Sequence, residues 1–233
     1  MDISFFRSRR PGPELLLEDA VVNWVDQLAP LANKPSWVAC SPTIGAGMPD
    51  ILFANYEPQV IALSKKKISN TQLLAYLRAV NGARLDTIMY HLKYPLKRIT
   101  TDLDELMEIE AIHQSEDLFF ISKLWKNIIP TIITIEVKVH DWHRAITQAT
   151  RNKIFSHQSY VALPKKLAIQ VKDNPIFINL GIGLLSIDGS GDLVCEEISA
   201  STNEPQIWEY YYKLAILLAN SRQGEPKCHS LYL

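Results

Sequence analysis

The most regular pattern of apolar and polar residues in the chain lies between residues 131 and 139. From Ile133 onward, β-branched apolar side chains alternate strictly with polar ones, which is the period of a β-strand. One face of this strand would be apolar, and the other would carry Thr134, Glu136 and Lys138. The pattern predicts a half-buried strand that presents a carboxylate and an ammonium group two residues apart on one face.

The segments before this strand predict a helix and two more strands. Residues 14–28 place leucine and valine at helical spacing, and Pro13 suits the first turn. Short apolar runs over residues 37–44 and 51–55 predict strands, joined by a glycine- and proline-containing turn that ends at Asp50. A second carboxylate is therefore expected at the start of a strand.

Between residues 64 and 124 the pattern changes to short helices followed by a hairpin. The expected elements are helices over 70–80, 85–92 and 96–108 and a hairpin over 112–121. Ser69 and Gln72 form a candidate capping box for the first helix, which Asn81-Gly82 is expected to end. The polar run 115–117 suits the hairpin tip. Three helices and a hairpin resemble a winged helix-turn-helix module.

The remainder of the chain returns to alternating helices and strands. The expected elements are a helix over 142–155, a strand over 159–164, a hairpin over 182–198 and an apolar helix over 205–220. We therefore predict an α/β protein in which residues 1–63 and 125–233 form a mixed β-sheet flanked by helices. Residues 64–124 would be an inserted winged-helix domain.

Composition narrows the class of protein further. With 47% hydrophobic and 21% charged residues, the 233-residue chain can bury one good core and a second small module. Lys and Arg number 24 against 25 Asp and Glu, so a nucleic-acid surface would have to be a local patch. Cys40, Cys195 and Cys228 lack metal-ligand spacing, which favours reduced thiols and a cytoplasmic location. No apolar run approaches the roughly 20 residues of a membrane span.

The order of Pro49-Asp50 and, downstream, Glu136-Val137-Lys138 resembles the PD-(D/E)XK superfamily of restriction endonuclease-like nucleases. The helix predicted before Asp50 and the one after Lys138 agree with the family's order of elements. Gln148 lies where many members carry a glutamine, whereas Asn152 replaces the aromatic residue that many carry four positions later. The resemblance implies a restriction endonuclease-like fold and metal-dependent hydrolysis of phosphodiester bonds, most simply in DNA.

The same resemblance implies a role for each residue of the site. Asp50, Glu136 and the backbone carbonyl of Val137 would bind Mg²⁺ or Mn²⁺, which prefer oxygen ligands. Glu18, on the opening helix, would complete the metal site in preference to Glu14. Lys138 would orient or activate the attacking water and stabilise developing negative charge, and Gln148 would hold the phosphate or Lys138 in place.

Simpler interpretations of these residues remain open at this point. Glu-x-Lys on a strand and paired acids on a helix are also common on solvated surfaces. His140 and His143 have a spacing that would suit a metal, but no third ligand or cysteine pair accompanies them, so they more simply cap a helix or line a groove. The glycine pairs lack the remaining residues of a dinucleotide or phosphate-binding loop, and no nucleotide cofactor is implied.

The inserted module offers a candidate DNA surface. Its third helix would enter the major groove and present Lys97, Arg98, Thr100 and Thr101, with Lys93 close to the phosphates. Winged helices also dock proteins or dimerise, and the later half of this helix is acidic.

We therefore expect a metal-dependent nuclease that acts on DNA and that could form a homodimer or a larger assembly. The alternatives are a catalytically inactive DNA-binding regulator or assembly subunit and, as a third possibility, a protein-interaction scaffold.

Overall fold

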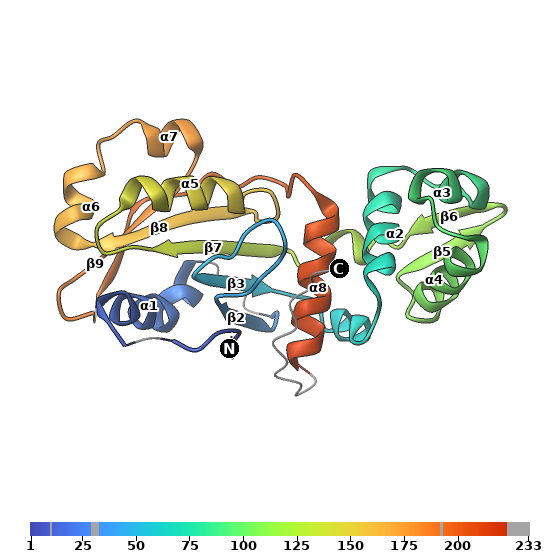
Figure 1. Cartoon of the computed structure of the whole chain (residues 1–233), viewed down its shortest axis with the longest axis horizontal. Helices are drawn as coiled ribbons and strands as arrows, with labels where there is room; N and C mark the ends of the chain where they lie inside the picture. Colours follow the sequence, from blue (N-terminus) through green and yellow to red (C-terminus); the bar gives the residue numbers. More distant parts are fainter. Residues whose placement is uncertain (10, 29–32, 192, 223–233) are drawn as a thin grey trace. The chain divides into compact units, whose positions relative to one another are not determined.

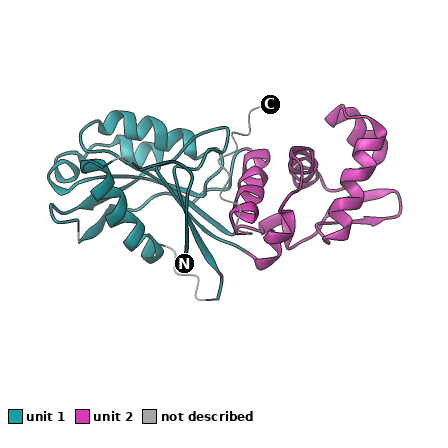
Figure 2. Ribbon diagram, turned by 60° about the horizontal axis from the view of Figure 1, so that its bottom comes forward, with its two compact units in different colours: residues 1–56, 130–206, 226–233 teal, residues 57–129, 207–225 magenta. Residues whose placement is uncertain are grey.

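A computed structural model of the chain describes residues 1–9, 11–28, 33–191 and 193–222, so Cys228 lies outside the described residues. The chain divides into two units, which are described separately below (Figure 2). Unit 1 contains residues 1–56 and 130–206, and unit 2 contains residues 57–129 and the described part of 207–225. The second unit thus interrupts the first between two of its strands.

Unit 1 is built on a seven-stranded mixed sheet with the order β1-β2-β3-β7-β8-β9-β10. Its strands are β1 (Asp2–Phe5), β2 (Ser36–Cys40), β3 (Ile51–Asn55), β7 (Thr131–Val137), β8 (Gln158–Pro164), β9 (Gly183–Ile187) and β10 (Val194–Ile198). At its centre, β7 pairs antiparallel with β3 and parallel with β8. Because Ile51 is opposite Ile135, the beginning of β3 lies beside the end of β7.

Helices cover both faces of this sheet (Figure 1). On one face lies α1 (Pro13–Trp24), and on the other lie α5 (Trp142–Asn152), α6 (Lys165–Val171) and α7 (Ile176–Leu180). The α1 side of the core includes alternate apolar residues of β7, and the α5 side includes alternate residues of β8. The predicted mixed α/β architecture with flanking helices is therefore present, and its period-two patterning sorts side chains between the two faces.

The prediction of a half-buried β7 is wrong, because residues 132–137 are all buried. Ile133, Ile135 and Val137 pack on the α1 side, as the alternation predicted. The polar face, which carries Thr134 and Glu136, meets α5 instead of solvent. Helix α5 begins where the Asp141 carboxylate accepts a hydrogen bond of 3.0 Å from the Arg144 N–H, which caps its first turn.

Unit 2 combines helices with a small three-stranded sheet of order β4-β6-β5. Its elements are α2 (Ile68–Ala79), β4 (Ala83–Arg84), α3 (Leu85–Leu92), α4 (Leu96–Glu108), β5 (Ile112–Ser115), β6 (Leu118–Ile121) and α8 (Trp208–Arg222). Short 3-10 turns at Pro58–Leu63 and Trp125–Asn127 precede and follow this group. The Ser69–Gln72 capping box is wrong: the helix starts earlier, and the Asn70 side chain accepts the Lys67 N–H at 2.9 Å.

The unit boundaries differ from those expected from sequence. Helix α8 belongs to unit 2, where it packs against α2 and the turn at Pro58–Leu63, and not to the domain that carries the large sheet. The Tyr211 hydroxyl, for example, accepts a hydrogen bond of 2.7 Å from the Ile129 N–H. Strands β1 and β4 and helices α6 and α7 were not predicted. None of the helices in the described residues is both long and apolar enough to cross a membrane.

Candidate functional site

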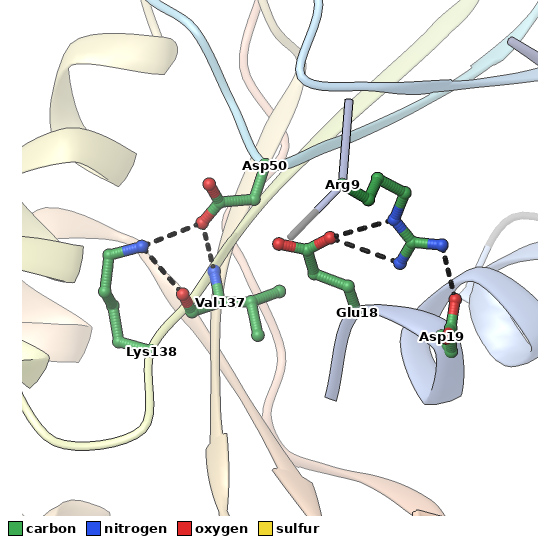
Figure 3. A network of polar contacts seen from close by, with 6 residues as sticks. All are labelled: Arg9, Glu18, Asp19, Asp50, Val137 and Lys138. Carbon is green, nitrogen blue, oxygen red and sulfur yellow. Dashed lines mark hydrogen bonds and ion pairs between the residues drawn. The ribbon is translucent and has the colours of Figure 1, made fainter. Parts of the chain in front are cut away.

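Asp50 meets the end of β7 directly. Its Oδ2 accepts hydrogen bonds from the Val137 N–H at 2.8 Å and from the Lys138 Nζ at 3.0 Å (Figure 3). These contacts follow from the antiparallel pairing of β3 with β7, in which Ile51 is opposite Ile135, so that Asp50 comes level with Glu136 and next to Val137. Asp50 and Val137 are 87 residues apart in sequence.

The Lys138 ammonium lies between two oxygen atoms. Besides Asp50, it donates to the Val137 carbonyl oxygen at 2.8 Å, and Glu14 of α1 lies 4.0 Å from the same nitrogen. The side chain is only 15% exposed. Burial lowers the pKa of Lys138, but the charge of Asp50 and its hydrogen bond outweigh this, so that the pKa is raised and the ammonium stays charged.

Glu136 is buried beside this pair and is held by α5. Its Oε1 accepts a hydrogen bond of 2.7 Å from Asn152 Nδ2, whereas its Oε2 is buried without a donor among the described residues. Burial raises the pKa of Glu136 to about 8, and the negative charge of Asp50 adds to the effect. The two carboxyl groups lie close enough to share a hydrogen bond when one is protonated.

Glu18 lies on α1 near Asp50 but is held by Arg9. Its Oε2 accepts from Arg9 Nε at 3.3 Å and Nη2 at 3.2 Å, while Asp19 binds Nη1 at 2.6 Å. In Figure 3 the other oxygen of Glu18 is turned away from Arg9, toward the side where Asp50 and Val137 lie. Burial raises the pKa of Glu18, the Arg9 hydrogen bond opposes this, and the charge of Asp50 again raises it.

Oxygen atoms of this chain suit a hard divalent cation at one point. Asp50 and the Val137 carbonyl meet at the Lys138 ammonium, and Glu136 lies beside Asp50. The unpartnered Oε2 of Glu136 is a buried acceptor that needs either a proton or a cation. Within the described residues, no group of three or more His, Cys, Asp or Glu side chains is arranged to hold a metal ion. The oxygen donors that could hold a metal are therefore the carboxylates of Asp50 and Glu136 and the Val137 carbonyl. Glu18 is hydrogen-bonded to Arg9 instead.

The structure brings together four predicted site residues, Asp50, Glu136, Val137 and Lys138, from the ends of two strands. Gln148 lies one turn before Asn152 on α5, so the two share a face of the helix, and its Oε1 is buried without a partner. His143 contacts the Trp142 ring and is exposed, as is His140.

Three residues near the site were missed by the sequence analysis. Asn152 was noted only as a departure from the family pattern, although its position four residues after Gln148 places it on the same helical face. At Gly47, an added Cβ would lie 2.4 Å from Asn152 Oδ1, so this glycine permits the close approach of its loop to α5. For Arg9, no periodic pattern or motif indicated a partner.

The predicted nucleic-acid-binding residues all lie in unit 2. Lys97, Arg98 and Thr101 are exposed in the first turns of α4, where they line a shallow hollow together with Lys67, Pro95 and Asp102. The Thr100 and Thr101 hydroxyls hydrogen-bond to carbonyls of their own helix, and the Arg98 guanidinium stacks on the Tyr94 ring. Lys93, exposed, ends α3 in a left-handed conformation.

A buried carboxylate lies beneath this basic surface. Asp102 is 1% exposed, and burial raises its pKa, opposed by the nearby Ser69 side chain and by the charge of Arg98. The sequence analysis had included Asp102 in the acidic later half of the helix. Its burial leaves the first turns of α4 with a more positive outer surface than the sequence suggested.

A scan against protein-family models, a search of curated proteins and a search of solved structures gave no significant match.

Proposed function

We propose that the chain is a metal-dependent nuclease of the PD-(D/E)XK class that hydrolyses phosphodiester bonds in DNA. The observation that carries the proposal is the convergence of Asp50, Glu136 and Lys138 at one end of the sheet. The Asp50 carboxylate accepts from both the Val137 N–H and the Lys138 ammonium, and Glu136 lies beside it. A solvated surface would not account for a glutamate that is 1% exposed and has one oxygen without a donor.

The arrangement of unit 1 supports a restriction endonuclease-like fold as part of this proposal. A helix precedes the strand that begins after Asp50, and the Glu136-Val137-Lys138 strand lies next to it at the centre of a mixed sheet. Helix α5 then follows and contributes Asn152 and Gln148 to the same side of that strand. For unit 2 we propose a winged helix, supported by helices α2, α3 and α4 and the β5–β6 hairpin.

The chain's own residues have separate tasks in the proposed reaction. Asp50, Glu136 and the Val137 carbonyl would hold Mg²⁺ or Mn²⁺, which when bound offsets phosphate charge and acidifies water. The Lys138 ammonium would donate hydrogen bonds to the phosphate oxygens that gain charge. Gln148, whose Oε1 has no partner among the described residues, would hold the phosphate or Lys138 in place. Asn152 keeps Glu136 in place through Oε1, so that Oε2 remains available.

The direct test is DNA cleavage by the purified protein with Mg²⁺ or Mn²⁺ against an EDTA control. Supercoiled, linear, single-stranded and branched DNA, together with RNA, would define the substrate. We expect Lys138→Ala and Asp50→Asn to reduce the cleavage rate by at least about 100-fold, the scale of a lost electrostatic contact in a transition state. The proposal fails if no substrate is cleaved, or if the variants and the wild type cleave equally.

A second candidate is a DNA-binding regulator or assembly subunit with an inactive nuclease-like core. The exposed Lys97 and Arg98 at the start of α4 favour it, since this surface does not depend on the residues of unit 1. DNA binding that is lost in a Lys97→Ala/Arg98→Ala variant, together with absence of cleavage in any metal, would identify this function. For either function we also propose a cytoplasmic location and assembly as a homodimer or a larger complex.

A further inference from the structure

We propose that the Lys138 ammonium occupies the cation position in the metal-free site and leaves it when a divalent ion binds. The inference rests on the proposed function, because it concerns the same oxygen atoms. It goes beyond that function by assigning the lysine two successive positions. In the first, it neutralises Asp50. In the second, it is free to contact the phosphate.

The contacts of the ammonium are those expected of a bound cation. Nζ lies 3.0 Å from Asp50 Oδ2 and 2.8 Å from the Val137 carbonyl oxygen, which are two of the three oxygen donors proposed for the metal (Figure 3). An ion ligated by the same two atoms would lie close to the present position of Nζ, since hard divalent cations bind oxygen at about 2.0–2.6 Å. Both cannot remain there.

The charges at the site also indicate that a bound ion would displace the ammonium. Asp50 and Glu136 place two acids together in a buried site, and Lys138 is the positive group in direct contact with Asp50. In the absence of metal, the ammonium therefore balances the negative charge of Asp50. A divalent ion at the acids would replace this function and repel the ammonium, which would be released from Asp50 and Val137.

The exchange has a consequence for the order of events at the site. While Nζ donates to Asp50 and Val137, two of its three N–H groups are engaged within the protein. Release by the ion makes them available to a phosphate oxygen. The amine would thus contact substrate only after the cation is in place, and a metal-free site would bind phosphate weakly.

The test measures metal affinity, without substrate, in variants that lack the ammonium. Mn²⁺ binding to the full chain is followed by the electron paramagnetic resonance signal of free Mn²⁺. Lys138→Met removes the charge, and Lys138→Gln keeps a neutral donor in case the methionine variant does not fold. The matched control is Lys153→Met, because the Lys153 ammonium also donates to a backbone carbonyl, that of Leu180. Asp50→Asn checks that the ion binds at this site.

We expect the Mn²⁺ dissociation constant to fall at least about tenfold in Lys138→Met, less in Lys138→Gln and not at all in Lys153→Met. Binding should be lost in Asp50→Asn. If the wild type binds Mn²⁺ and both Lys138 variants bind it equally or more weakly, the exchange is wrong and the nuclease proposal stands. If neither the wild type nor a Lys138 variant binds Mn²⁺, the metal site and the proposed function both fail.

Discussion

Asn152 Nδ2 donates a hydrogen bond of 2.7 Å to Glu136 Oε1, and both residues are 1% exposed. The contact joins the last turn of α5 to the centre of the sheet and satisfies one oxygen of a carboxylate whose other oxygen has no donor. Many nucleases of the class that the sequence resembles carry an aromatic residue here. In this chain an amide takes that place and becomes a positioning group for the acid, which makes Asn152 the first residue to test.

Replacing Asn152 by alanine should destabilise the protein by about 2 kcal/mol, the cost of leaving a buried acceptor without its partner. The loss should be greatest above pH 8, where Glu136 is charged. Urea unfolding of the metal-free protein measures the change. Thr147→Ala, on the exposed side of the same helix, is the control and should change stability by less than about 0.5 kcal/mol. Equal effects of the two substitutions would contradict the positioning role.

Gly47→Ala should destabilise the protein by about 1–3 kcal/mol, because the new methyl group would lie 2.4 Å from Asn152 Oδ1. Gly189→Ala is the matched control, since nothing lies within 4 Å of a Cβ there. In the double variant with Asn152→Ala, the alanine at residue 47 has room. The double variant should therefore lose less stability than the sum of the losses in the two single variants. Strict additivity would show that the close approach is not the cause.

The metal-free protein should lose stability as the pH rises from about 4.5 to about 8. The pKa of Glu136 is about 8 in the folded chain against an ordinary value of 4.5, so in this range the folded state retains a proton that the unfolded state releases. The contribution is complete below pH 4.5 and amounts to roughly a few kcal/mol. Glu136→Gln should flatten the profile. Thermal unfolding in EDTA across this pH range measures the effect. If Glu136 were not the cause, the melting temperatures of the wild type and of Glu136→Gln would change with pH in parallel.

Arg9→Met should weaken the N-terminal part of unit 1, since one guanidinium holds both Glu18 and Asp19. The group is 20% exposed, so the expected loss is about 1 kcal/mol and not more. The pKa of Glu18 should rise further, because its hydrogen bond to Arg9 lowers it. The pKa is measurable by carbon NMR of the carboxylate. Arg7→Met, at an exposed position two residues earlier, should leave it unchanged.

For unit 2, the combined Lys97→Ala/Arg98→Ala variant should bind DNA more weakly at all sequences. If both side chains contact phosphates, the slope of log affinity against log salt should fall by about 2. Fluorescence anisotropy at several salt concentrations gives both quantities. Lys172→Ala, an exposed lysine of unit 1, is the control. An unchanged slope would favour protein docking as the role of α4.

Several elements of the fold were predictable because their local patterns are strong. Strand β3, helices α3 and α4 and the hairpin of β9 and β10 lie close to where periodicity and turn residues placed them. Strand β1 was missed because its four residues gain their partner only from β2, more than 30 residues later. Helix α8 was assigned to the wrong unit because an apolar helix does not reveal in its sequence what it packs against.

The candidate site shows the same division between local and long-range information. The order Asp50, Glu136, Lys138 could be read from sequence, and alternation correctly placed Glu136 opposite the apolar face of β7. The sequence of β7 does not show that its polar face is covered, because the covering element, α5, is a separate amphipathic helix. The Arg9–Glu18 pair and the approach of Gly47 to Asn152 depend on loop geometry that no sequence period encodes.

The two strands that supply the site are hydrogen-bonded neighbours, yet the whole of residues 57–129 is synthesised between them. During translation, Asp50 leaves the ribosome while Val137, its N–H donor, is still many codons away. A nascent chain that ends within unit 2 therefore lacks β7, which carries Glu136 and the partner of Asp50. Because a long loop must close before the two strands pair, the site assembles later than elements held by local contacts. Truncated chains released at that stage would carry no competent centre.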